Sequence, residues 1–172
     1  RSLHADMQET LAGNQADPTT MSRPFSATRD GSVLGEGAGA MICETLEHAK
    51  NRGATLLGEI VGYGSSAVGP AAGEHHLQSS MENVLRAALG DESPASIGHI
   101  HAHGLGTPRC DSQESAAIAS VFGPAEKQPP VTTAKGHFGN LGAGSGMVET
   151  IASLKSLGET LFPILNCESP DD

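Results

Sequence analysis

The stretch His99–Asp111, HIHAHGLGTPRCD, decides the fold that we expect for the rest of the chain. Three histidines alternate with apolar or small residues, which is the pattern of a β-strand approaching its end. Gly104 and Gly106 then turn the strand into a loop, and Asp111 is predicted to cap a helix that continues to Val121. A histidine at the end of a strand is well placed for chemistry, because open α/β sheets carry their sites there.

Strand-like and helix-like segments alternate on both sides of this stretch. We expect further strands over Ala38–Glu44, Leu56–Gly64, Val131–Ala134 and Leu161–Leu165, and helices over Thr45–Arg52, Leu77–Leu89 and Gly139–Leu157. Such alternation predicts an α/β fold with a mostly parallel sheet covered by helices on both faces. Cys43 lies within the first of these strands and is expected to point into the core.

Composition narrows the class of protein. The chain has 172 residues, enough for one domain, and its 10 basic and 20 acidic residues give a net charge of −10. No basic cluster exists to neutralise phosphates, so we expect neither nucleic acid nor an anionic membrane as partner. No apolar run approaches the ~20 residues that span a bilayer. The three cysteines (Cys43, Cys110 and Cys167) show no CxxC spacing, which favours a reducing, cytoplasmic location over a disulfide framework.

The three histidines have two interpretations. His99, His101 and His103 are spaced by two residues and therefore face the same side of a strand, where three imidazoles can hold zinc. Alternatively, His99 marks the start of the strand and His101 is a hydrogen-bonded core histidine. No carboxylate at an obvious spacing supports the metal, so the loop after His103 is the better functional cue, and we expect no metal site.

Charged residues further along the chain could support a site near this loop. Lys135 follows a predicted strand and could pair with Glu149, or it could be a solvated surface residue. Asp111 and Glu114 lie one helical turn apart and could also face Lys135.

The roles of two residues in and just after this loop remain open. Thr107 could donate a hydrogen bond to a ligand or cap a turn. Cys110 is close to a predicted helix start, which would activate a thiolate, but the acidic residues that follow it oppose thiolate formation.

Five stretches occur in an order that resembles one known family. They are Arg23–Gly39, Glu44–Ala54, Ala102–Glu114, Lys135–Glu149 and Pro163–Asp171. Together they resemble the C-terminal half of a β-ketoacyl-acyl carrier protein synthase over roughly residues 20–172. The resemblance implies the thiolase fold, in which two similar α/β halves pack together. Residues 1–172 would then form a partial C-terminal domain, and the nucleophile-bearing N-terminal half and the final strands would lie outside this chain.

The resemblance also implies a reaction, the decarboxylative Claisen condensation of malonyl carrier protein with an acyl thioester in fatty acid or polyketide synthesis. A cysteine of the N-terminal half takes the acyl group in this family. No stretch of this chain resembles that nucleophile motif, so we expect the chain alone to be inactive. The acyl carrier protein brings the phosphopantetheine arm, and the enzyme needs no cofactor of its own. Its expected partners are the carrier protein, the missing N-terminal half and a second subunit in a homodimer.

The implied site residues follow from matching positions. His103 matches the first of two histidines that stabilise the enolate, and its N–H can donate to the enolate oxygen. The second histidine should stand five residues after Lys135, where this chain has Asn140, whose amide can still donate. Lys135 and Glu149 keep the family's spacing and would tune the electrostatics of the site. Asp111 and Glu114 belong to the same loop motif and would support it.

Two departures motivate an alternative function. The family carries two threonines that hold the pantetheine arm, but here Leu105 replaces the first and Thr107 keeps the second. With Asn140, this change suggests a noncatalytic partner subunit that resembles chain-length factors. The residue at the upstream nucleophile position discriminates between an enzyme and such a partner.

Overall fold

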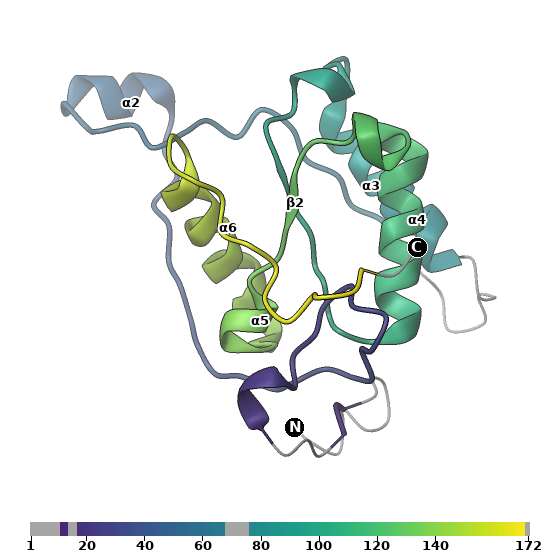
Figure 1. Cartoon of the computed structure of the whole chain (residues 1–172). Helices are drawn as coiled ribbons and strands as arrows, with labels where there is room; N and C mark the ends of the chain where they lie inside the picture. The colour runs from purple at the N-terminus through teal and green to yellow at the C-terminus, as the bar shows by residue number, and fades with distance from the viewer. Residues whose placement is uncertain (1–10, 14–16, 68–75, 171–172) are drawn as a thin grey trace.

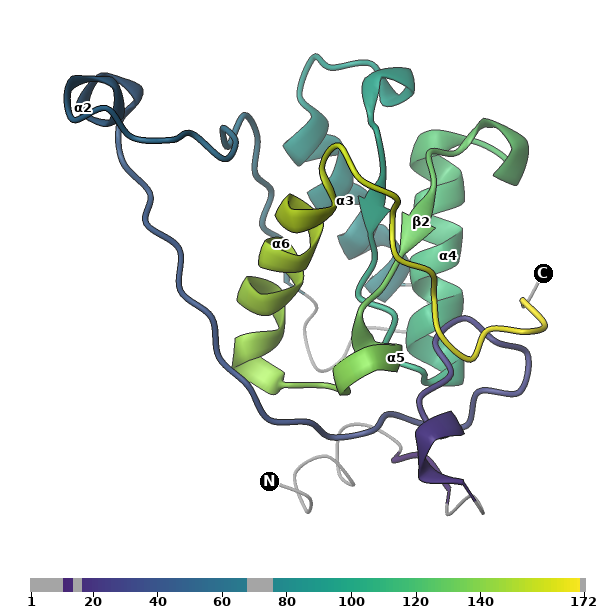
Figure 2. The same ribbon diagram turned by 60° about the vertical axis from the view of Figure 1, so that its left-hand side comes forward.

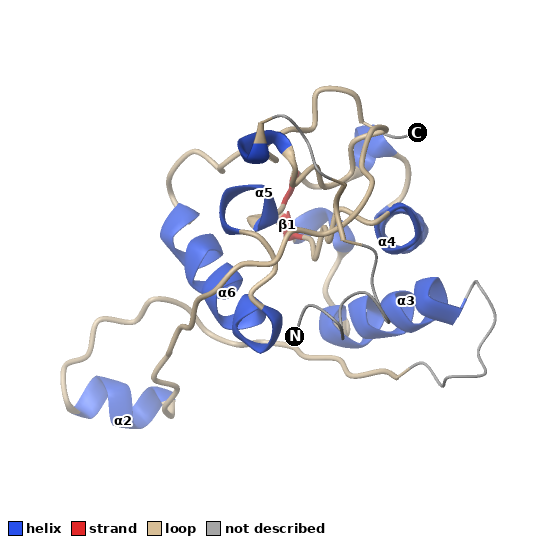
Figure 3. Cartoon of the chain, turned by 90° about the horizontal axis from the view of Figure 1, so that it is seen from below, coloured by secondary structure: helices blue, strands red, loops and turns tan. Residues whose placement is uncertain are grey.

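The computed structural model describes residues 11–13, 17–67 and 76–170. Two short parallel strands lie at the centre of this part of the chain, β1 (Ile100–His101) and β2 (Val131–Thr132). Helix α6 (Ser145–Ser156) lies on one side of the strands, and α3 (His76–Leu89) and α4 (Pro108–Phe122) lie on the other (Figure 1). The same order of layers is visible from below (Figure 3). The predicted parallel α/β arrangement is therefore confirmed, although both strands are shorter than expected.

The core forms between α4 and the strands. Four buried side chains make its centre, namely Ala102, Ile118, Val121 and Phe122. The partly buried side chains that pack against them are Phe25, Leu85, Leu89, Ile97, Ile100 and Val131. The three residues from α4 are three or four positions apart or adjacent, so they line one face of that helix. Each such buried side chain contributes about 1.5–3 kcal/mol, which holds α3 and α4 against the strands.

The helices differ from the predictions mainly at their starts. Helix α2 (Leu46–Asn51) is capped by the Thr45 hydroxyl, and α3 covers the predicted 77–89 segment, so both predictions are confirmed. Helix α4 begins at Pro108, with Thr107 as its N-cap, so the prediction that Asp111 caps it was wrong. Helix α6 begins only at Ser145, because a 3₁₀ turn precedes it. A four-residue helix, α5 (Lys135–Phe138), was not predicted.

Two predicted strands are absent. Residues 38–44 and 56–64 are extended but belong to no strand, since no neighbouring strand in the described part pairs with their backbone groups. Ile42 is 89% exposed, and Cys43 is exposed rather than in the core, so that expectation was wrong. We call residues 35–64 the arm. Figure 2 shows the arm running away from the strands to α2 and back.

The arm touches the helices through its glycines. A Cβ added at Gly62 would lie 1.9 Å from the carbonyl oxygen of Ala88 on α3, so only glycine allows that approach. Gly39 similarly lies next to Met147 and Ile151 of α6. The large side chains of the arm remain exposed, among them Leu57, Ile60, Val61 and Tyr63.

The C-terminal segment returns across the molecule to the N-terminal one. The Asn166 amide donates to the carbonyl oxygens of Thr19 and Ser22 at 3.0 and 2.9 Å, and the Ala27 N–H donates to the Ser169 carbonyl oxygen at 2.7 Å. The strand predicted over Leu161–Leu165 is absent, because this segment has no ladder partner within the described residues. None of the helices in the described part is long and apolar enough to cross a bilayer.

Candidate functional site

The loop that follows β1 carries His103, and Glu114 of α4 fixes its backbone. We call residues 103–107 the histidine loop. The Glu114 carboxylate accepts from the His103 N–H at 2.7 Å and from the Gly104 N–H at 2.9 Å. Burial raises the pKa of Glu114, and these two donors act in the opposite direction. Glu114 therefore orients the loop through its backbone and does not reach out to a ligand.

Asp111 fixes the other end of the histidine loop. Its carboxylate accepts from the Gly106 N–H at 3.1 Å and from the Phe25 N–H at 2.9 Å, and the Arg29 Nε atom lies 3.9 Å away. Burial raises the pKa of Asp111, while these donors and Arg29 oppose the rise. Gly106 has a φ of 85°, and a Cβ there would lie 2.8 Å from the Gly31 carbonyl oxygen. Asp111 thus ties the loop to the segment around Phe25.

Lys135 lies at the centre of a three-acceptor network behind His103. It stands on the first turn of α5 and is only 1% exposed. Its ammonium donates to the Glu149 carboxylate at 2.5 Å, to the His103 carbonyl oxygen at 2.8 Å and to the His103 Nδ1 atom at 3.2 Å. A lysine ammonium has three N–H groups, so these acceptors use all of them.

This network sets the protonation of His103. Because Lys135 donates to Nδ1, that nitrogen must be an acceptor, and the proton of the neutral ring lies on Nε2. Loss of solvation and then repulsion from Lys135 lower the pKa of His103 to about 4, although Glu149 acts the other way. The residue as a whole is exposed, so a ligand can reach it. His103 is therefore a neutral Nε2–H donor at neutral pH.

Asn140 follows α5 and faces the start of α6. Its side-chain oxygen accepts from the Gly142 N–H at 2.9 Å and from the Ser145 hydroxyl at 3.3 Å. Its backbone N–H donates to the Val33 carbonyl oxygen at 2.7 Å, which anchors it to the N-terminal segment. An asparagine side chain carries two N–H donors in addition to this oxygen.

The two remaining loop residues point inward. The Thr107 oxygen accepts from the Cys110 N–H at 3.4 Å, as expected for the N-cap of α4, and Thr107 is buried. The capping interpretation of Thr107 is thus the one that the structure shows. Leu105 is also buried, so it fills the interior of the loop and presents no polar group to a ligand. Cys110 is half-buried on the first turn of α4.

His99 and His101 are held by Ser153 of α6. The Ser153 oxygen lies 2.7 Å from Nδ1 of His101 and 3.1 Å from Nε2 of His99. Across the residues that the structure describes, no group of three His, Cys, Asp or Glu side chains is arranged to hold a metal ion. The interpretation of His101 as a hydrogen-bonded histidine therefore fits the geometry. Ser153 was missed from the sequence, although its position four residues after Glu149 places it on the same face of α6.

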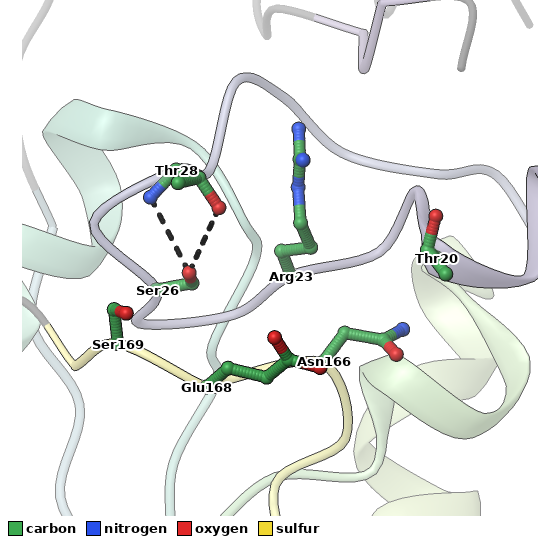
Figure 4. Close-up of a pocket in the computed structure, with 7 residues that line it drawn as sticks. All are labelled: Thr20, Arg23, Ser26, Thr28, Asn166, Glu168 and Ser169. Carbon is green, nitrogen blue, oxygen red and sulfur yellow. Dashed lines mark hydrogen bonds between the residues drawn. The ribbon is translucent and has the colours of Figure 1, made fainter. Parts of the chain in front are cut away.

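A polar pocket of about 240 Å³ lies between the N-terminal and C-terminal segments (Figure 4). Its lining combines one cation, one carboxylate, an amide and four hydroxyls, from Thr20, Arg23, Ser26, Thr28, Asn166, Glu168 and Ser169. The neighbouring Ser22 hydroxyl donates to the Lys135 carbonyl oxygen at 2.8 Å, so the pocket adjoins the back of the network. The pocket was not predicted, because its lining comes from segments more than a hundred residues apart.

Comparison with known proteins identifies the family. Residues 57–168 match the family described as "Beta-ketoacyl synthase, C-terminal domain". That match covers most of the chain, and the chain belongs to this family.

The curated relatives share one name. "3-Oxoacyl-[acyl-carrier-protein] synthase 2" of Coxiella burnetii is 36% identical over 168 residues, which cover 94% of this chain and 40% of that protein. The protein of the same name from Vibrio cholerae serotype O1 is 36% identical over 174 residues, covering 95% of this chain and 41% of that protein. The chain therefore spans about 40% of the length of the curated relatives it matches.

Solved structures agree with the family. A beta-ketoacyl synthase from Burkholderia phymatum matches with a TM-score of 0.84 and 31% identity, over 99% of this chain and 41% of that one. A ketosynthase in complex with its type II PKS acyl-carrier protein matches with a TM-score of 0.83 and 29% identity, over 99% of this chain and 43% of that one. The ishigamide ketosynthase/chain length factor matches with a TM-score of 0.76 and 29% identity, over 98% of this chain and 42% of that one. The thiolase-like fold of ketosynthases, expected from the sequence, is confirmed.

Proposed function

We propose that the protein containing this chain is a 3-oxoacyl-[acyl-carrier-protein] synthase of fatty acid or polyketide synthesis. In this proposal the chain supplies the enolate-stabilising part of the active site. The observation that carries it is the contact of Lys135 with Nδ1 of His103, at 3.2 Å. That contact leaves the Nε2–H of a neutral imidazole as a fixed donor, which an enolate oxygen requires.

The proposed reaction begins when malonyl carrier protein loses CO2. The bond between the carboxylate carbon and the methylene carbon breaks, and its electron pair moves into the thioester as an enolate. His103 donates Nε2–H to the enolate oxygen, and an Asn140 amide N–H provides the second hydrogen bond. The enolate carbon then attacks the carbonyl carbon of an acyl group held on a cysteine. The carbon–sulfur bond breaks, and the cysteine leaves as a thiolate. That cysteine belongs to the part of the protein outside this chain.

The supporting residues have distinct roles in this proposal. Lys135 and Glu149 hold the tautomer and position of His103, whereas Asp111 and Glu114 hold the backbone of the histidine loop. Thr107 remains on the path of the pantetheine arm, but its oxygen already caps α4. Leu105 stands where the resembled motif has a threonine, but it is buried and offers the pantetheine no hydroxyl.

Partners follow from the proposed reaction. The substrate arrives on an acyl carrier protein, whose phosphopantetheine supplies the thioester, so the enzyme needs no resident cofactor. The remaining N-terminal half of the same protein would supply the nucleophile, and a homodimer is the proposed assembly. The three cysteines are free thiols, as suits the cytoplasm, where we place the enzyme.

The decisive experiment measures CO2 release from malonyl carrier protein by the whole natural protein. His103→Ala should lower the rate about 10²–10³-fold, the usual loss for one oxyanion donor. Asn140→Ala should lower it by a similar factor. His137→Ala is the matched control, because His137 is an exposed histidine whose Nε2 atom lies 3.2 Å from the Pro163 carbonyl oxygen. Wild-type rates in His103→Ala would refute the proposal, and the 172-residue chain alone should show no condensation.

A second function is favoured by two residues. Leu105 and Asn140 depart from the resembled motif, and one structural neighbour is the ishigamide ketosynthase/chain length factor. If the protein is a noncatalytic partner subunit, the unmutated protein would release no CO2. It would also carry a residue other than cysteine at the upstream nucleophile position. Mass measurement of the native gene product, with peptide mapping upstream of Arg1, decides between the two functions.

A further inference from the structure

Ser153 joins helix α6 to strand β1 through two histidine rings. Its oxygen lies 2.7 Å from His101 Nδ1 and 3.1 Å from His99 Nε2, and both histidines stand at the strand that leads into the histidine loop. His101 also packs edge-on against Phe162, with ring centroids 5.6 Å apart. The Ser153 hydroxyl thus forms a polar link between α6 and the strand, and Phe162 packs against one of its two histidine rings.

The same face of α6 carries Glu149 one turn earlier. Residues four apart on a helix lie above one another, so Glu149 and Ser153 both face the strand side of α6. Glu149 reaches Lys135 at 2.5 Å, and Lys135 reaches Nδ1 of His103 at 3.2 Å. A change in the distance between α6 and β1 would therefore be passed through Glu149 and Lys135 to the His103 ring.

We propose that Ser153 is a positioning residue, which holds α6 at the distance from β1 that lets Glu149 and Lys135 fix the tautomer of His103. The functional meaning of this inference rests on the proposed role of His103, but the geometry does not. We call Ser153 with His99 and His101 the serine latch.

The two hydrogen bonds of the serine latch have a preferred direction. A hydroxyl has one proton, so Ser153 can donate to only one of the two rings. The Nε2 atom of His101 is buried without a hydrogen-bond partner. Placing the His101 proton on Nδ1 avoids burying an unpaired N–H at Nε2. His101 then donates to Ser153, and Ser153 donates to His99.

Burial and neighbouring groups favour the neutral form of the His101 ring. His101 faces Glu149 of α6, Lys135 of α5 and His99 on its own strand. Burial lowers the pKa of His101, Lys135 and His99 lower it further, and only Glu149 raises it. The His101 ring therefore stays neutral at neutral pH, and the hydrogen bonds of the serine latch are retained there.

The test uses nuclear magnetic resonance of the protein labelled with nitrogen-15 histidine, and it needs no substrate. Nitrogen shifts report the tautomer of each ring, and a pH titration reports its pKa. In wild type, His103 should show one tautomer, Nε2–H. In Ser153→Ala, it should show both tautomers, and its titration midpoint should rise by on the order of one pH unit, because Lys135 is no longer held beside Nδ1.

Two further variants separate positioning from folding. Ser153→Thr keeps the hydroxyl and should retain the wild-type tautomer, whereas Ser153→Val has nearly the same volume and should lose it. Ser156→Ala is the matched control, because the Ser156 hydroxyl donates to the Ala152 carbonyl oxygen within α6 and not to a histidine of the latch. An unchanged His103 tautomer and midpoint in both Ser153→Ala and Ser153→Val would overturn the inference. This result would leave the CO2-release test untouched, so the two proposals can fail separately.

Discussion

The histidine loop and the arm are built on opposite principles, although both connect elements of the same α/β unit. In and behind the histidine loop, buried charged groups dominate, and each has named partners: Asp111, Glu114, Lys135 and Glu149. In the arm, extended backbone carries large apolar side chains that are exposed. The loop is thus complete within this chain, whereas the arm has an apolar surface that a partner could cover.

The difference shows what each region needs from the rest of a protein. Buried charges are stable only when they are paired and hydrogen-bonded. The charged groups around the histidine loop have such partners within this chain: Lys135 pairs with Glu149, and Asp111 accepts from the Phe25 N–H and lies near Arg29. Apolar extended segments gain stability only when they bury area against another surface. The three predictions below test this contrast with matched pairs of variants, starting with the largest expected effect.

Removing the Lys135 ammonium should have the largest effect on stability. Lys135→Met leaves the buried Glu149 carboxylate without its cation, and breaking a buried pair in this way costs about 3–5 kcal/mol. Urea unfolding followed by circular dichroism measures the loss. Lys155→Met, at an exposed position on α6, should change the free energy of unfolding by less than about 0.5 kcal/mol. A small loss in Lys135→Met would show that the network is not a buried pair in solution, and Glu149→Gln should partly restore the stability of that variant.

Two isoleucines compare the core with the arm directly. Ile118 is 4% exposed and Ile42 is 89% exposed, so the same substitution tests both regions. Ile118→Ala should cost about 2–5 kcal/mol through lost burial and the cavity it leaves. Ile42→Ala should change the free energy of unfolding by less than about 0.5 kcal/mol. Equal losses at the two positions, measured by the same urea unfolding, would mean that the arm is packed against another surface in solution.

Two threonine caps give the smallest and sharpest comparison. Thr107 caps α4 and Thr45 caps α2, each by accepting from the N–H three residues later. Thr107→Ala should cost about 1 kcal/mol in global stability, because α4 carries the core. Thr45→Ala should leave global unfolding unchanged and only speed hydrogen exchange in α2, since this six-residue helix lies apart from the core. A global loss of stability from Thr45→Ala would contradict the separation of α2 from the core.

The helices and the site could be predicted from local patterns. Helix α3 follows from apolar residues at helical spacing, and α2 lies within the predicted helix Thr45–Arg52. His103, Lys135 and Glu149 were predicted as site residues because the histidine loop and the following motif resemble a family whose residues keep their order and spacing, and the structure brings the three side chains together. Their grouping around one ammonium is a long-range property that only the structure shows.

The strands were the weakest predictions, for a physical reason. A strand exists only when a neighbour pairs with its backbone, and the sequence of Leu56–Gly64 carries no information about whether that neighbour is present. Cys43 was expected in the core because small and apolar residues surround it, but the same pattern describes an exposed arm. Ser153 was missed because a lone serine inside a helix has no pattern, and its meaning comes from the two histidines opposite it.

The hydrogen bonding of all three N–H groups of Lys135 also has a consequence for chemical reactivity. An amine reacts with acylating reagents through a free lone pair, and the Lys135 ammonium is 1% exposed and gives all its protons to acceptors. Lys50, Lys127 and Lys155 are exposed and have no such constraint. Covalent labelling of lysines therefore reports whether the hydrogen-bond network around Lys135 is intact. Lys135 becomes modifiable only when its ammonium no longer donates to Nδ1 of His103.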